Sequence, residues 1–140
     1  MASTIPRTYR KEITDALEGE TLYVAFFTNS MSTWTGLSAV EKTYAQVATI
    51  YTESTGTGYT IGGVPLPVTS ANMAGNAANI NADDDTELTI STALTARFAV
   101  VYNHTSGLIR SVTDLGGDYT VTSGKMTIVW DAVNGVIKCS

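Results

Sequence analysis

The sequence is short of cysteine and of charge, and each shortage excludes a class of protein. Cys139 is the only cysteine among 140 residues, so no intrachain disulfide can form, and a lone thiol is interpreted as incidental. Charged residues make up 15% of the chain, and 13 acidic against 8 basic side chains give a net charge of −5. Binding to nucleic acid regardless of its sequence requires a basic face. The composition therefore predicts no nucleic-acid partner.

Long apolar runs are also missing. No run approaches the ~20 residues of a membrane-spanning helix. The first 13 residues, MASTIPRTYRKEI, lack the apolar stretch of a secretory signal peptide. We therefore expect no membrane partner, and a chain made in a reducing cytoplasm.

Threonine, by contrast, is abundant, at about one residue in six. Threonine, valine, isoleucine and tyrosine favour pleated strands, and frequent turn signals separate short segments rich in them. This pattern predicts an all-β protein, an antiparallel β-sandwich of jelly-roll-like or related barrel type, with one short N-terminal helix. We expect residues 1–13 to form an N-terminal arm and the start of this helix, and residues 14–140 to form a single domain.

The individual elements follow from residue spacing. Tyr9, Ile13 and Leu17 recur every four residues, which predicts one stripe of a helix over residues 8–17 that docks on a sheet. Residues 21–28 are apolar on both faces, as in a central strand. Residues 39–50 predict a helical turn that runs into a strand. Further strands are expected at 78–82, 87–91, 96–103, 108–113, 119–122, 125–130 and 135–138, with a turn at Gly116-Gly117 between two of them.

The segment Ser54–Leu66, STGTGYTIGGVPL, raises the question of a phosphate-binding loop. Such a loop needs a following helix and usually a lysine, whereas this segment has no basic residue and is followed by prolines. We therefore predict no cofactor and a backbone role. The glycines would take positive φ in turns on either side of a strand centred on Tyr59, where the chain reverses. These glycines are Gly56, Gly58, Gly62 and Gly63.

Candidate catalytic and metal-binding groups are few. His104 is the only histidine and lies in NHTSG, typical of a solvated hairpin loop, with no second histidine or activated cysteine to form a triad. The run Asp83–Glu87 has four carboxylates, but its spacing does not match a calcium-binding loop. A solvated turn is the preferred interpretation, and a bound cation stays an alternative. We predict no catalytic residue, no metal site and no enzyme.

The candidate partner-binding residues are basic or aromatic. Arg7, Arg10 and Lys11 cluster in an otherwise acidic chain, and a terminal arm that carries them could hold an acidic neighbour. Trp34 and Tyr44 lie in or near loops, where aromatic rings form interface hot spots. As an alternative, Trp34, Tyr51 and Tyr59 could form a flat exposed platform for sugar rings.

Four blocks of the sequence resemble a family of small virion-associated proteins of tailed bacteriophages. They are TDALEGETLYVAFFTNS at 14–30, TGTGYTIGG at 55–63, TARFAVVYN at 95–103 and LIRSVTDLGGDYTVTSGKMTIVWDAVNGVI at 108–137. In the family pattern a tryptophan usually precedes the strand that begins TAR. Leu88, Ile90 and Leu94 occupy that region here.

The resemblance implies a non-enzymatic virion component with a β-sandwich body. Within that class we expect a decoration or cement protein, a homo-oligomer that binds the outside of the major capsid protein shell. A neck or tail protein of the same virion is the first alternative. A carbohydrate-binding module for attachment to the host surface is the second.

Overall fold

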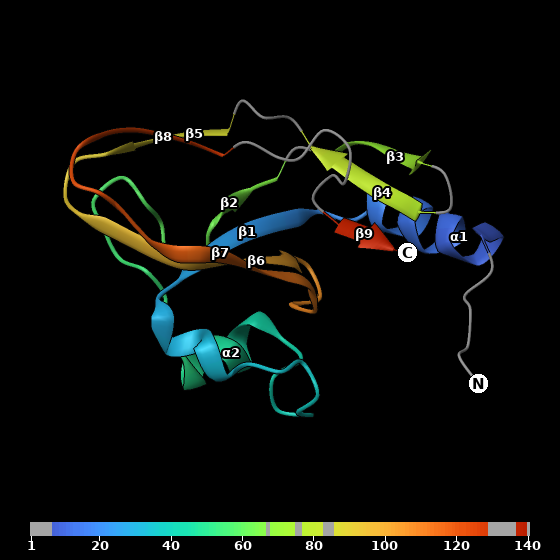
Figure 1. The fold of residues 1–140 in the computed structure, drawn as a ribbon, viewed down its shortest axis with the longest axis horizontal. Coiled ribbons are helices and arrows are strands. Elements are labelled where there is room, and N and C mark those ends of the chain that lie inside the picture. Colours follow the sequence, from blue (N-terminus) through green and yellow to red (C-terminus); the bar gives the residue numbers. More distant parts are fainter. Residues whose placement is uncertain (1–6, 67, 75–76, 83–85, 129–136, 140) are drawn as a thin grey trace. The chain divides into compact units, whose positions relative to one another are not determined.

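The computed structural model describes residues 7–66, 68–74, 77–82, 86–128 and 137–139. The chain divides into two compact units (Figure 1). The first unit draws on residues 1–20, 66–86 and 128–140, and the second on residues 21–65 and 87–127. The prediction of one domain over residues 14–140 stays a prediction.

The first unit pairs a helix with a small sheet. Helix α1 (Arg7–Glu18) contacts strands β3 (Val68–Ala74) and β4 (Ala77–Ala82), and β4 also pairs with β9 (Ile137–Cys139). All pairings in this sheet are antiparallel. The predicted helix and its docking on a sheet are confirmed.

The predicted stripe of α1 is confirmed at Leu17 and wrong at Tyr9, so the buried face of the helix is rotated from the expected one. Tyr9 is 54% exposed, whereas Arg10, Thr14 and Leu17 are buried. Thr14 can be buried because its hydroxyl donates to the carbonyl of Lys11 at 3.0 Å, so its polar atom stays paired within the helix.

The second unit is built on a four-stranded antiparallel sheet, shown in Figure 1. Strand β1 (Leu22–Phe27) lies inside this sheet and is buried along nearly its whole length, which confirms the predicted central strand. The order across the sheet is β2 (Val64–Pro65), β1, β6 (Leu94–Asn103) and β7 (Ile109–Val121). Strands β5 (Thr86–Ile90) and β8 (Gly124–Ile128) pair separately.

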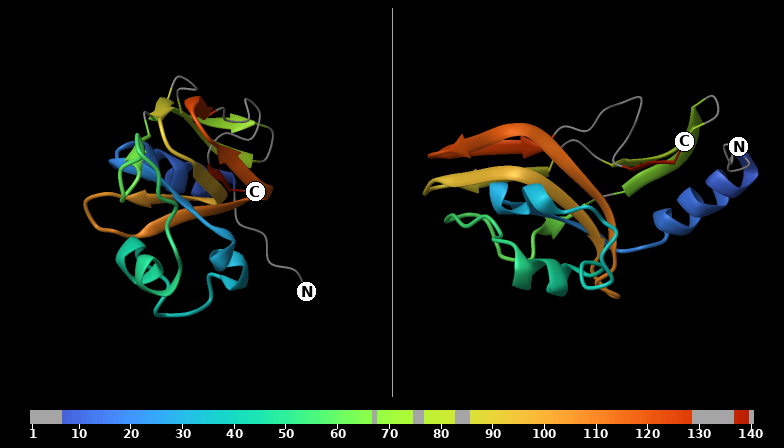
Figure 2. Two further views of the ribbon diagram at one scale, coloured as in Figure 1. Left: turned by 90° about the vertical axis from the view of Figure 1, so that its left-hand side faces the viewer. Right: turned by 60° about the horizontal axis from the view of Figure 1, so that its bottom comes forward.

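A short 3-10 helix, η1 (Asn29–Thr33), and helix α2 (Tyr44–Ile50) lie together on one side of this sheet (Figure 2). The apolar side chains between them and the sheet form the core, and burial of each large one contributes about 1.5–3 kcal/mol. The buried members of this core are Ala25, Phe27, Met31, Val47, Tyr51, Phe98, Val100 and Tyr102.

The strand predicted at the end of residues 39–50 is wrong, because α2 continues to Ile50. The helix starts with a capping box: the Thr43 hydroxyl accepts from Gln46 N, and the Gln46 side-chain oxygen accepts from Thr43 N. Val47 is then fully buried in the core. The cap and this contact outweigh the strand preference of the β-branched residues.

The predicted turn at Gly116-Gly117 is also wrong. Both glycines lie within β7, so two expected strands are one. The pairing with β6 shifts between Ala96, opposite Tyr119, and Phe98, opposite Asp114, so β7 carries three extra residues here, which form a large β-bulge. Gly116 has a φ of +83° within this bulge, a backbone conformation that glycine adopts easily because it has no Cβ.

The structure thus confirms the coarse prediction of a strand-rich chain with an antiparallel four-stranded sheet and a short N-terminal helix.

Candidate functional site

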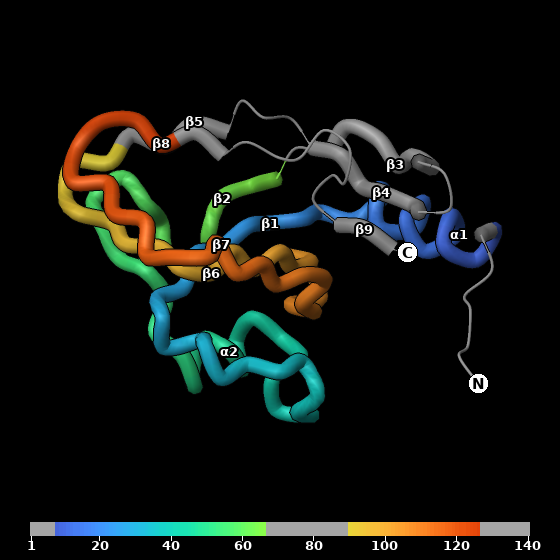
Figure 3. Tube along the Cα trace, in the orientation of Figure 1, coloured from blue at the N-terminus to red at the C-terminus, as the bar shows by residue number. Residues whose placement is uncertain are grey.

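The glycine-rich segment is a loop inserted into one edge of the sheet. Glu53 pairs with Phe27 of β1, and Val64 pairs with Val24, both in antiparallel register. In an uninterrupted strand residue 56 would lie opposite Val24, so eight extra residues are accommodated in the loop. Figure 3 follows this path from α2 to β2. The predicted chain reversal is wrong, since the chain resumes the same pairing in the same direction.

The buried side chain of Glu53 forms hydrogen bonds with residues of this loop. Its side chain is only 8% exposed. One carboxylate oxygen accepts from the Tyr59 hydroxyl at 2.7 Å and from Gly62 N at 2.9 Å, and the other accepts from the Tyr44 hydroxyl. Hydrogen bonds to an ionised group are stronger than those between two neutral groups. We call Glu53 with Tyr44, Tyr59 and Gly62 the Glu53 cluster.

The Tyr59 hydroxyl forms a hydrogen bond with β1 at the point where the loop interrupts the edge strand. Its hydroxyl accepts from Phe26 N at 2.9 Å while it donates to Glu53. The backbone N–H of β1 that loses a strand partner at the insertion is therefore still paired. Tyr59 itself is buried between two turns, so the prediction of a strand centred on it is wrong.

The predicted positive φ is confirmed for three of the four glycines. Gly58, Gly62 and Gly63 have φ values of +101°, +100° and +86°. Gly56 is not among the positive-φ glycines of the described residues. Gly63 meets a second requirement, because a Cβ there would lie 2.1 Å from the carbonyl oxygen of Val24.

The cluster gives one amide of the loop an acceptor within the chain. An amide of the loop does bind an anion, but the anion is the chain's own Glu53 carboxylate. Sequence reasoning missed Glu53, although a single acidic residue between Tyr51 and the glycines was a signal. Its partners Tyr44 and Gly62 could be identified only from the tertiary structure.

Aromatic rings extend the cluster across the sheet. Tyr44 stacks on Tyr102 with ring centroids 4.6 Å apart, and the Tyr102 hydroxyl donates to the carbonyl of Gly62 at 2.5 Å. Tyr23 stacks on His104 at 3.9 Å. Tyr44, a predicted partner-binding residue, is thus half-buried and joins α2 to the loop.

The tyrosines of the cluster should resist ionisation. The pKa values of Tyr59 and Tyr44 are raised above the ordinary 10, mainly because burial disfavours the phenolate and because each hydroxyl donates to Glu53. The unfolded chain ionises its tyrosines near pH 10, whereas the folded chain keeps these two protonated. This contribution to stability is complete below pH 10 and is lost as the pH rises above it.

We therefore expect an alkaline titration of the phenolate absorbance to stop short of all seven tyrosines while the folded circular dichroism persists. The remaining absorbance should appear together with unfolding. Full ionisation of the seven in the folded protein would contradict the role of the cluster.

A second contact joins two other blocks of the sequence. Arg97 of β6 forms a bidentate ion pair with Asp114 of β7, at 2.7 and 3.1 Å. Asp114 also accepts from Gly116 N at 2.8 Å, so the pair holds the β-bulge. The hydrogen bonds from Arg97 and Gly116 lower the pKa of Asp114.

The basic partner-binding candidates lie on α1. Arg7 begins the helix, Arg10 is buried, and Lys11 forms an ion pair with Asp15. Residues 1–6 of the predicted arm lie outside the described residues, and so do Asp83 to Asp85 of the acidic run.

The proposed sugar platform is wrong as an exposed surface. Tyr51 and Tyr59 are each 8% exposed, and their hydroxyls donate to Glu41 and Glu53. Trp34 is half-buried. His104 is exposed in the turn between β6 and β7, as predicted.

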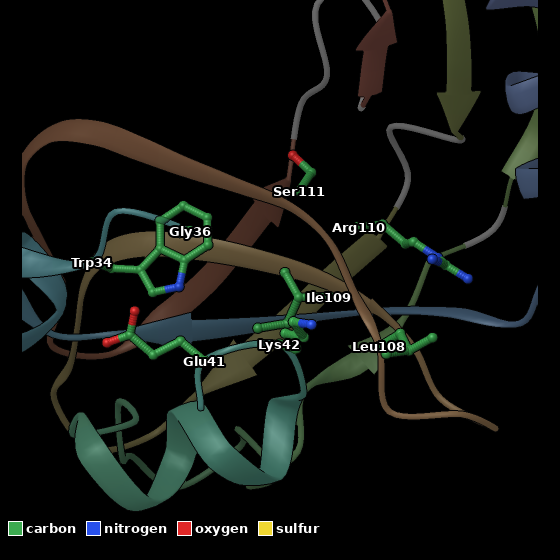
Figure 4. Close-up of a pocket in the computed structure, with 8 residues that line it drawn as sticks. All are labelled: Trp34, Gly36, Glu41, Lys42, Leu108, Ile109, Arg110 and Ser111. Carbon is green, nitrogen blue, oxygen red and sulfur yellow. The ribbon is translucent and has the colours of Figure 1, made fainter. Parts of the chain in front are cut away.

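Trp34 lies beside a groove of about 320 Å³, shown in Figure 4. Its indole nitrogen is shielded from solvent and has no hydrogen-bond partner among the described residues. Gly36, with a φ of +73°, packs so closely that a Cβ would lie 2.8 Å from the indole. The groove, called the Trp34 groove below, is lined by Trp34, Gly36, Glu41, Lys42, Leu108, Ile109, Arg110 and Ser111.

Comparison with known proteins adds no relative. No protein-family model, curated protein or solved structure matches the chain. Within the described ranges, no three His, Cys, Asp or Glu side chains gather in a group that could hold a metal ion. No helix in that part of the chain is both long and apolar enough to cross a membrane.

Proposed function

We propose that this protein is a non-enzymatic structural component of a tailed-phage virion. Its specific role would be decoration: copies of a β-sandwich body bind the outside of the shell formed by the major capsid protein. A homo-oligomer on a repeating lattice can be held by individually weak contacts, because multiple attachment raises the effective affinity.

The observation that carries the proposal is how the resembling blocks contact one another. Gly63 of the glycine block packs on Val24 of the first block, and Gly62 accepts from Tyr102 of the TAR block. Arg97 of the TAR block binds Asp114 of the last block. The residues that carry the resemblance therefore act as braces between elements, which supports a scaffold role.

The chemistry of the Glu53 cluster supports the non-enzymatic part. Both carboxylate oxygens are occupied by donors of the chain itself. The raised pKa values of Tyr44 and Tyr59 disfavour loss of their protons near neutral pH. Such groups stabilise a loop and are poorly suited to proton transfer.

Localisation on purified virions by gold-labelled antibody tests the proposal. We expect label distributed over the head. Label at one vertex or along the tail would instead indicate a neck or tail protein and overturn the decoration role. No label on intact virions, with the protein present in infected cells, would overturn the virion proposal itself.

A further inference from the structure

We propose that the Trp34 groove binds an extended, acidic segment of a partner chain, which adds as a strand to the edge of β7. The inference names the contact surface for the proposed assembly and in that respect rests on the proposed function. Its argument uses only residues of the second unit.

The first step is that the edge of β7 already pairs with a short segment of the chain itself. Strand β7 is the last strand in the order of the four-stranded sheet. Among the described residues, the pairing at this edge is confined to its start: Thr43 pairs with Leu108, and Ile109 N donates to the Lys42 carbonyl at 3.0 Å. From Arg110 onward no strand of the described residues pairs with that edge.

The second step is that the groove lies where this pairing stops. Lys42 still pairs with Ile109, Glu41 precedes it in the chain, and Arg110 and Ser111 follow Ile109 on β7. In Figure 4, Trp34 and Glu41 lie on one side of the groove and Leu108 and Arg110 on the other. An added strand would therefore continue the pairing that Lys42 and Thr43 start, as in peptide recognition by β-augmentation.

The third step concerns the side chains that the occupant would carry. Leu108 of the lining is 39% exposed, and Leu37 and Val40, which lie between the lining residues Gly36 and Glu41 in the sequence, are 89% and 58% exposed. Exposed apolar surface rimmed by polar groups marks interaction sites. Apolar side chains on one face of an added strand would cover it.

Charge selects an acidic occupant. Lys42 has no ion-pair partner among the described residues. The one acidic residue of the lining, Glu41, already accepts from the Tyr51 hydroxyl at 2.6 Å. With Lys42 and Arg110 against Glu41, the lining has a formal charge of +1 in a chain of net charge −5.

The indole N–H of Trp34 lacks a hydrogen-bond acceptor among the described residues. A buried donor without an acceptor costs about 1–3 kcal/mol relative to a paired one. In Figure 4 its nitrogen edge faces the side on which Lys42 and Ile109 lie. Because the nitrogen is shielded from solvent, a carbonyl or carboxylate of the occupant would supply the missing acceptor once the ring turns toward the groove.

A displayed library of random heptapeptides, selected on the folded full chain, tests the proposal. We expect enriched peptides to combine Asp or Glu with β-branched or aromatic residues. Lys42→Glu should weaken their binding at least about tenfold, because an ion pair becomes a repulsion. Lys125→Glu, the same charge change at an exposed residue of β8 outside the groove lining, should leave binding within about twofold. Basic or absent consensus sequences, or binding indifferent to Lys42→Glu, would overturn the proposal.

The indole N–H resonance of Trp34, assigned with Trp34→Phe, supplies a second measurement. An enriched peptide should displace this resonance, and the same peptide with N-methylated backbone amides should not bind. Equal displacement by acetate alone would identify a simple anion site, and equal binding of the methylated peptide would exclude strand addition. Both results would overturn the proposal. The isolated chain is used, so these outcomes are independent of where the protein lies in a virion.

Discussion

Replacement of Gly63 by alanine is expected to lower the free energy of unfolding by at least about 3 kcal/mol. The φ of +86° is unfavourable for a residue with a Cβ. In addition, the new Cβ would lie 2.1 Å from the Val24 carbonyl oxygen and 2.9 Å from the Cα of Ala25. Because these are backbone atoms of the central strand, no side chain can move aside to relieve the clash. Urea unfolding followed by circular dichroism measures the effect.

Gly116→Ala is the matched control. Its φ of +83° is nearly the same, but a Cβ there would meet nothing within 4 Å. We expect the control to lose only about 1–2 kcal/mol, the conformational term alone. The difference between the two variants then measures the contact with β1. Equal losses would show that the loop does not press against β1 as described.

Truncation of Glu53 should have a comparable effect. Glu53→Ala removes the acceptor of two tyrosine hydroxyls and of Gly62 N. Each buried donor left unpaired costs about 1–3 kcal/mol, and such losses add incompletely within one network. We expect a total loss of about 3–5 kcal/mol in the free energy of unfolding. The tyrosines should also ionise at lower pH, because the hydrogen bond and the charge that raise their pKa values are removed.

Two variants make this result specific. Glu53→Gln keeps the shape and one acceptor oxygen, so it should recover more than half of the lost stability. Glu41→Ala removes a carboxylate that, among the described residues, accepts from the Tyr51 hydroxyl alone, and we expect less than a third of the effect of Glu53→Ala. An unchanged unfolding midpoint for Glu53→Ala would contradict the proposed closure of the loop by this side chain.

The Gly63 and Glu53 variants distinguish two interactions that stabilise the same loop. Gly63 allows the loop to approach β1, and Glu53 binds its two ends together, since it precedes the loop while Gly62 lies near its end. A double variant should lose less than the sum of the single losses, because both residues act on the same segment.

Local sequence was sufficient where local forces decide the structure. The apolar residues of β1 predicted a buried central strand, because a strand covered on both faces cannot show alternation. Gly58, Gly62 and Gly63 were predicted at positive φ because that preference belongs to the residue itself. The hairpin loop at His104 follows from its own turn residues.

Tertiary contacts decided the features on which local signals were silent or misleading. A strand preference at residues 39–50 was overridden by a cap and by the burial of Val47. Gly116 and Gly117 looked like a turn but form a bulge, because Arg97 on the neighbouring strand holds Asp114 beside them.

The candidate sites show the same division. The sequence by itself determined a strand-rich, charge-poor chain with a glycine-rich segment of backbone function, since composition and intrinsic conformational preference act residue by residue. Only the tertiary structure brought Glu53 to Tyr44 and Gly62, Gly63 to Val24, and Trp34 to the edge of β7. Such contacts join residues far apart in the chain and depend on the register of the sheet, which no single segment specifies.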